Sequence, residues 1–189
     1  MSLLVPGTQG IVTKVPEYEL TLDVALKLHD ELLARGYNVF LIRQTHDVNI
    51  SNMERSFIAK DGKANILVRL HANGTETSSV SGITTLCPTK NNPHVSTYAQ
   101  SRSLSEFILA EMVKTTNAKN RGVLEVDNMS GINWAVMPVT IVEMGFMTNP
   151  EEDKLMQSED YQQKLAAGIA NGIDLYFAEQ ICKGVYYEY

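Results

Sequence analysis

Ile66-Leu67-Val68-Arg69-Leu70-His71 and Val139-Thr140-Ile141-Val142-Glu143 are the two stretches that decide the fold of this chain. Each is a short apolar run followed by turn-forming residues, which is the pattern of a buried parallel strand. Each also ends in a titratable side chain. Active sites of open α/β sheets usually lie at the carboxyl ends of the strands. The pattern therefore predicts that the His71 imidazole and the Glu143 carboxylate converge at one edge of a sheet.

Helical segments alternate with apolar runs along the rest of the chain. Leucine and valine recur at four-residue steps over residues 17–33, which predicts a helix with one buried face. Ser51 and Glu54 form a capping box that predicts a helix over residues 51–60. Further helices are expected over 97–115, 150–157 and 159–178, and further strands over 37–43, 82–87 and 123–126. This alternation predicts a single α/β domain with a mostly parallel twisted sheet flanked by helices on both faces.

Composition limits the classes of function. The 189 residues suffice for one domain with a full core, and 44% hydrophobic and 20% charged residues are ordinary for a globular protein. A net charge of -6 with scattered Lys and Arg argues against binding to nucleic acid. No apolar run is long enough to span a bilayer. Residues 1–4 do not form a signal peptide, so any export signal is expected outside this chain.

The two cysteines, Cys87 and Cys182, are expected to be free thiols. They are too few for a disulfide framework, and neither belongs to a CxxC pair that would suggest a metal site. The Gly7-Thr8-Gln9-Gly10 stretch lacks the Lys and Ser/Thr of a phosphate-binding loop, and we expect it to be a flexible loop.

Two of the titratable residues have the strongest case for chemistry, although each has a structural alternative. His71 could be a hydrogen-bonded histidine of the core. Glu143 follows four apolar residues, where a carboxylate is costly to bury unless it is paired or binds a metal. It could form an ion pair with Arg43 or Arg69. The functional interpretation is a base with a raised pKa that takes a proton from water.

Glu17 is a third candidate, at the start of the first predicted helix. Glu17 and Glu19 lie in its first turn, where the helix dipole favours negative charge, so capping alone could explain both. The same position also faces the strand ends, where a carboxylate could bind a metal ion. Among the other histidines, only His46 could reach the same sheet edge and serve as a metal ligand, and we regard this role as remote.

Several of these segments recur in the same order in a known family. They are Glu17–Leu22, Gly36–Val39, Arg43, Glu54-Arg55, Arg69–Asn73, Ile141–Asp153 and Ala167–Ile173. In this order they resemble the zinc-dependent N-acetylmuramoyl-L-alanine amidases, above all the cell-wall amidases of clostridial-type bacteria and their phages. The resemblance implies a catalytic domain over residues 7–180, a tail over 181–189, and a location outside the cell or in the cell wall.

The resemblance also implies a reaction. Family members hydrolyse the amide between the lactyl group of N-acetylmuramic acid and L-alanine of the peptidoglycan stem peptide. They hold zinc through His, Glu and His, with a water in the open position, and a further Glu acts as the base. By position, Glu17 resembles the ligand Glu, His71 the second ligand His and Glu143 the base. The substrate is expected to contact Asn73, Asn128 and Asn133.

The chain departs from the family at its beginning. The family's first strand ends in Asp-x-Gly-His, whose His is the first zinc ligand, and this sequence has no such motif. We therefore expect weak zinc binding or none, and slow hydrolysis. The alternative is an amidase-like domain that binds peptidoglycan without cleaving it. Loss of a strand is also expected to expose a sheet edge and to favour a homodimer.

Overall fold

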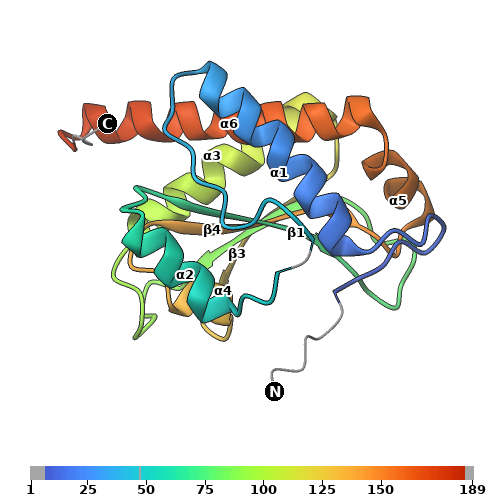
Figure 1. Ribbon diagram of the computed structural model, residues 1–189, viewed down its shortest axis with the longest axis horizontal. Helices are drawn as coiled ribbons and strands as arrows, with labels where there is room; N and C mark the ends of the chain where they lie inside the picture. The colour runs from blue at the N-terminus through green and yellow to red at the C-terminus, as the bar shows by residue number, and fades with distance from the viewer. Residues whose placement is uncertain (1–6, 47, 186–189) are drawn as a thin grey trace.

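A computed structural model describes residues 7–46 and 48–185 of the chain (Figure 1). Its elements, in order, are α1 (Glu17–Ala34), α2 (Asn52–Asp61), β1 (Leu67–Asn73), β2 (Ile83–Pro88), α3 (Tyr98–Thr116), β3 (Asn120–Val126), α4 (Ser130–Asn133), β4 (Val139–Phe146), α5 (Pro150–Met156) and α6 (Glu159–Cys182). Every helix expected from the sequence is present. Helix α6 continues two residues into the predicted tail, and residues 186–189 of that tail lie outside the described part.

Local chemistry explains where the helices begin. At the start of α2, the Ser51 hydroxyl accepts a hydrogen bond from the Glu54 N–H, and the Glu54 carboxylate accepts one from the Ser51 N–H, so the predicted capping box is confirmed. At the start of α5, the Asn149 side-chain oxygen accepts hydrogen bonds from the N–H groups of Glu151 and Glu152, directly after Pro150. Proline is favoured there because the first helical position needs no N–H.

The sheet has the strand order β1-β4-β2-β3. Strands β1 and β4 run parallel, as do β2 and β3, whereas β2 and β4 are antiparallel. Two of the three pairings are therefore parallel, which confirms the mostly parallel sheet. The register of the first pair places His71 directly opposite Glu143.

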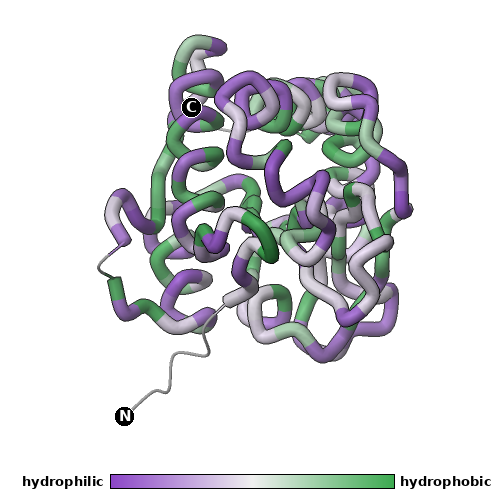
Figure 2. The backbone as a smooth tube through the Cα atoms, turned by 90° about the vertical axis from the view of Figure 1, so that its right-hand side faces the viewer, coloured by the Kyte–Doolittle hydropathy of each residue, from purple (hydrophilic) through white to green (hydrophobic). Residues whose placement is uncertain are grey.

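Helices cover both faces of the sheet, as expected (Figure 1). Helices α1, α3 and α6 lie on one face, and the shorter α2 and α4 on the other. The larger core cluster lies under α1, α3 and α6 and contains Val142 and Met144 of β4. A smaller cluster on the α2 side contains Val139 and Ile141. Figure 2 shows hydrophobic and hydrophilic positions alternating along the chain, as this two-sided burial requires.

The strand expected over residues 37–43 is not formed, and that prediction is wrong. Exposure alternates at Tyr37–Phe40 in the way a half-buried strand requires. However, no backbone hydrogen bond joins residues 38–45 to another backbone group of the described chain. A strand needs a partner, and β1, the neighbouring edge of the sheet, pairs only with β4. Residues 37–43 therefore have the amphipathic pattern of a strand without the backbone hydrogen bonds that would pair it.

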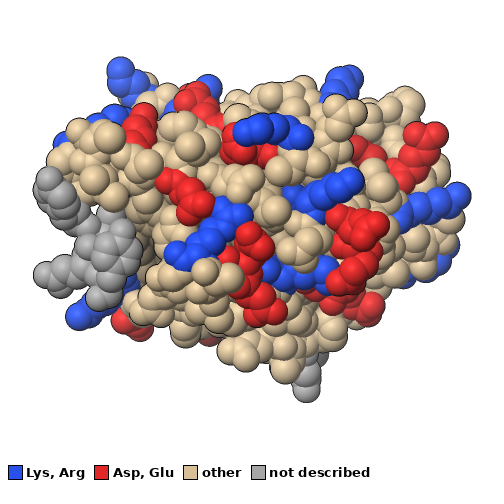
Figure 3. All heavy atoms as spheres, turned by 90° about the horizontal axis from the view of Figure 1, so that it is seen from above, with Lys and Arg blue, Asp and Glu red and all other residues tan. Residues whose placement is uncertain are grey.

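The structure describes both cysteines, the helices and the charged residues of one face. Cys87 is buried, Cys182 is exposed, and both are free. No helix in the part of the chain that the structure describes has the length and apolarity to cross a membrane. Figure 3 views the α1 and α6 side of the molecule and shows acidic and basic side chains interspersed. That face therefore presents no continuous basic surface of the kind that binds nucleic acid.

We predict that Gly172→Ala destabilises the protein, although alanine is the better helix former. A Cβ at position 172 would lie 2.4 Å from the Ile108 Cα, because α6 packs against the backbone of α3 there. Overpacking of this kind costs about 1–3 kcal/mol, against a propensity gain of about 1 kcal/mol. Thermal denaturation should show a lower Tm than wild type. The exposed control Gln163→Ala on the same helix should show no loss, and an unchanged Tm for Gly172→Ala would contradict the packing.

Candidate active site

The site lies at the carboxyl ends of β1 and β4. His71 and Glu143 are cross-strand neighbours in a parallel pair, so both side chains project from the same face of the sheet. This face is the one covered by α2 and α4, because Val139 and Ile141, at the same alternation as Glu143, belong to the smaller core. The His71 side chain is 39% exposed, which excludes the alternative of a histidine buried in the core.

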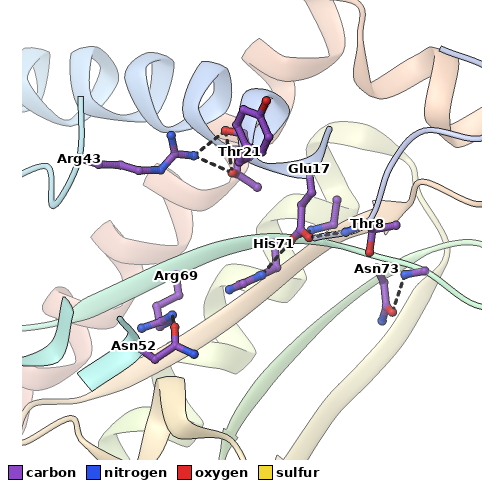
Figure 4. Close-up of polar contacts among 11 residues, drawn as sticks. Thr8, Glu17, Thr21, Arg43, Asn52, Arg69, His71 and Asn73 are labelled. Carbon is purple, nitrogen blue, oxygen red and sulfur yellow. Dashed lines mark hydrogen bonds and ion pairs between the residues drawn. The ribbon is translucent and has the colours of Figure 1, made fainter. Parts of the chain in front are cut away.

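Glu17 reaches this pair from the start of α1. His71 Nδ1 donates to Glu17 Oε1 over 2.8 Å, and the Ala72 N–H donates to the same oxygen over 3.2 Å. The Thr8 N–H donates to Glu17 Oε2 over 3.0 Å. Figure 4 shows the Glu17 carboxylate between His71 and Thr8. Burial acts to raise the pKa of Glu17, but the hydrogen bond and charge of His71, with the two backbone donors, hold it below its ordinary value.

The segment before α1 is fixed at both ends, so the expectation of a flexible loop is wrong. The Glu17 N–H donates to the Thr8 carbonyl over 2.8 Å, and Gln9 forms a β-bridge with Pro16. The buried Asp153 carboxylate accepts from the N–H groups of Val12 and Thr13 at 2.7 and 2.9 Å. Carboxylates distant in sequence therefore hold this loop, which the local sequence did not indicate.

Glu143 is half-buried towards the end of β4. Its Oε2 atom is buried and has no hydrogen-bond partner among the described residues. Burial raises the pKa of Glu143 to about 7, while the charge of His71 lowers it and the charge of Glu17 raises it. Within the described chain no ion pair joins Glu143 to Arg43 or Arg69, so the structural alternative considered for Glu143 is not observed. A carboxylate titrating near neutral pH is suited to accept a proton from water.

The predicted substrate contacts and the remote histidine are distributed around this centre. Asn73 follows His71 on β1, and its side-chain oxygen accepts from the Gly74 N–H. Asn128 is exposed, whereas Asn133 donates to the Asp127 carbonyl and accepts from Asn92. The substrate roles of the three asparagines stay predictions. His46 lies edge-on against the Tyr18 ring, 5.5 Å between centroids, and bonds to no other site residue.

A hydrogen-bonded link between β1, α2 and α4 was not expected from the sequence. Arg69 lies two residues before His71 and projects from the same face of β1. Its Nη2 donates to Asn52 Oδ1, and the Asn52 amide donates to the Ser130 hydroxyl over 2.9 Å. The Arg69–Asn52 contact thus joins β1 to α2 next to His71 (Figure 4).

The donors present do not complete a catalytic zinc site. Such a site takes three protein ligands and leaves one position open. Glu17 and His71 provide two donors in direct contact with each other. Over residues 7–46 and 48–185, no three His, Cys, Asp or Glu side chains are grouped so that they could hold a metal ion. The described residues thus supply two of the three expected ligands. They do not support a chemical step that passes through a metal ion.

Comparison with known proteins agrees with this architecture. The sequence profile of the N-acetylmuramoyl-L-alanine amidase family matches residues 5–175. The uncharacterized protein YqiI of Bacillus subtilis is 32% identical over 85% of this chain and 74% of its own length. The N-acetylmuramoyl-L-alanine amidase of Clostridium difficile 630 superposes with a TM-score of 0.83 at 27% identity, covering 93% of this chain and 91% of that one.

A second solved structure gives the same result. The catalytic domain of CwlV, an amidase from Bacillus (Paenibacillus) polymyxa var. colistinus, has a TM-score of 0.81 at 28% identity over 92% of this chain and 91% of its own. The fold and its sheet edge thus define an α/β domain of the amidase type. The chain belongs to the N-acetylmuramoyl-L-alanine amidase family, whose members hydrolyse an amide of peptidoglycan.

We predict that Glu17→Gln lowers the free energy of unfolding by about 1–3 kcal/mol, because a half-buried carboxylate accepting three hydrogen bonds becomes a neutral amide that cannot satisfy the same donors. Urea denaturation measures the effect. Glu19→Gln, two residues along the same helix and without such bonds, is the matched control. Equal stability of the two variants would show that Glu17 does not tie the loop to β1.

Proposed function

We propose that this domain acts on the amide between the lactyl group of N-acetylmuramic acid and L-alanine of the peptidoglycan stem peptide, with Glu143 as the base. The observation that carries the proposal is the buried Glu143, whose pKa is raised to about 7 beside the Glu17–His71 pair. Peptidoglycan is then its partner, and the cell wall its place of action.

Glu143 is suited to move the proton in this reaction. Glu143 is half-buried, so its carboxylate can accept a proton from a water that attacks the lactyl carbonyl, while its Oε2 lies buried without a hydrogen-bond partner among the described residues. The protonated carboxyl would then donate to the departing amine of L-alanine. His71, directly opposite on β1, can hold the reacting groups by hydrogen bonding, because its ring is partly exposed at the same face.

Zinc is the cofactor that the family resemblance implies, and it would polarise the scissile carbonyl and activate the water. We propose Glu17 and His71 as its two protein donors in this chain. Because two donors are fewer than a catalytic site takes, we propose that zinc is held weakly and that hydrolysis is slow.

We predict that the purified chain binds less than one equivalent of zinc after dialysis and cleaves muramyl peptides poorly. Metal analysis and chromatographic detection of released peptide measure the two quantities. Glu143→Gln should abolish the residual cleavage without changing the zinc content, because the base is not one of the two donors. A full equivalent of tightly held zinc with rapid turnover would contradict the proposed incomplete site.

Binding without cleavage is the second candidate function. The observation that favours it is the absence of a three-donor group in the described residues. A sedimentation assay with purified cell walls distinguishes the two functions. Retention on the walls with no released peptide, in wild type and Glu143→Gln alike, supports a binding domain, whereas release that depends on Glu143 supports the hydrolase.

The open edge of β1 also supports the predicted homodimer. In the parallel ladder the Leu67 N–H points to β4, so those of Val68 and Leu70 point to the open side. Two such edges from separate copies can pair.

We predict a concentration-dependent dimer in light scattering. A monomer mass at every concentration up to the millimolar range would refute this proposal.

A further inference from the structure

Three arginines next to the candidate site are not in direct contact with any carboxylate of the described residues. Arg43, Arg55 and Arg69 form no ion pair with any carboxylate of the described residues, whereas Arg35 and Arg102 each bind two. This is unexpected in a chain whose net charge is -6, because carboxylates outnumber basic groups. The three are called the arginine cluster below.

The cluster is built from three separate segments that meet around the end of β1. Arg43 Nη2 donates to the Tyr18 carbonyl over 2.5 Å and to Thr21 Oγ1 over 3.1 Å, in the first turns of α1 directly after Glu17. Arg69 lies on β1 beside His71. Arg55 follows Asn52, the partner of Arg69, by one turn of α2. Figure 4 shows Arg43 beside α1 and Arg69 on β1, both on the same side of His71 in this view.

Burial makes this arrangement costly without an anion. Arg69 is 9% exposed, and its Nε and Nη1 atoms have no hydrogen-bond partner among the described residues. The charge of Arg55 acts on both Arg43 and Arg69, and at Arg43 the charge of Asp23 opposes it. A guanidinium still carries its charge at neutral pH. The three charges therefore add to one positive potential at the site, in a region of reduced solvent screening.

We propose that the arginine cluster is a subsite for a carboxylate of the stem peptide, placed so that the lactyl amide one residue away along the peptide reaches Glu143. This inference rests on the proposed function and specifies which part of the substrate is recognised. Arg43 and Arg55, which are half-buried, are the residues that contact the carboxylate. Arg69, which lies buried on β1, contributes a fixed positive charge and the hydrogen bond to Asn52.

The chemistry of the substrate fits this assignment. A muramyl peptide is neutral at its amide bonds and bears its negative charge on carboxylates of the peptide. Guanidinium groups bind carboxylates through paired hydrogen bonds, which supply orientation in addition to attraction. A subsite of this kind binds the substrate along a fixed direction and disfavours amidated peptides.

The test compares two ligands in a buffer with a chelator, so that no ligand is hydrolysed. One is N-acetylmuramoyl-L-alanyl-D-glutamate with free carboxylates, and the other is the same compound with both carboxylates amidated. Isothermal titration should show that wild type binds the free acid at least tenfold more tightly than the diamide. Arg55→Gln should remove that preference while leaving the affinity for the diamide unchanged, and Arg55→Lys should retain part of it.

Arg121→Gln is the matched control, because Arg121 also lacks an ion pair in the described chain but packs on Phe146 from β3. It should keep the full preference. Arg43→Gln supplies a second variant if Arg55→Gln is unstable.

Equal affinity of wild type for the two ligands would overturn the subsite while leaving the proposed function intact. Failure of wild type to bind either ligand would instead refute the proposed function. A change of oligomeric state in Arg55→Gln, without a change in ligand preference, would assign the cluster to contacts between copies and overturn the subsite.

Discussion

The Glu17 carboxylate is the interaction on which the rest of the site depends. It accepts hydrogen bonds from Thr8, His71 and Ala72, and so joins the loop before α1 to the end of β1. Without this contact nothing in the described chain would fix the ring of His71 against the start of α1. A charged acceptor can satisfy three donors at once, and a neutral side chain at the same position cannot. The geometry of the site thus follows from one buried charge.

The electrostatics of the site follow from the same crowding of charges in a region of low polarity. Burial raises the pKa of Glu143 to about 7, whereas hydrogen bonds hold the pKa of Glu17 low. The Glu17 and Glu143 carboxylates belong to the same site but differ in protonation, because among the described residues only Glu17 accepts hydrogen bonds from nearby donors. This difference assigns Glu17 to holding the structure and Glu143 to moving a proton. The arginine cluster adds positive charge at the same edge, where an anionic substrate would approach.

Much of this could be predicted from the sequence, because the signals were local or periodic. The runs ending at His71 and Glu143 gave the two central strands and their common edge, and the Ser51–Glu54 pair gave the start of α2. The sequence could not show whether residues 37–43 pair with another strand. Their alternation was correct, but pairing depends on a partner that the segment itself does not specify.

The contacts that the sequence did not reveal are long-range. Asp153 holds Val12 and Thr13 across about 140 positions of sequence, and no local pattern marks such a bond. The arginine cluster also joins three segments that are unremarkable separately. Glu17 and His71 are the two side chains of this site that we expect to bind a metal ion. Zinc-edge anomalous diffraction from zinc-soaked crystals tests this central claim directly. The account predicts a partly occupied ion bound by these two side chains. A fully occupied ion with three protein ligands from the described residues, or one bound away from Glu17 and His71, would contradict it.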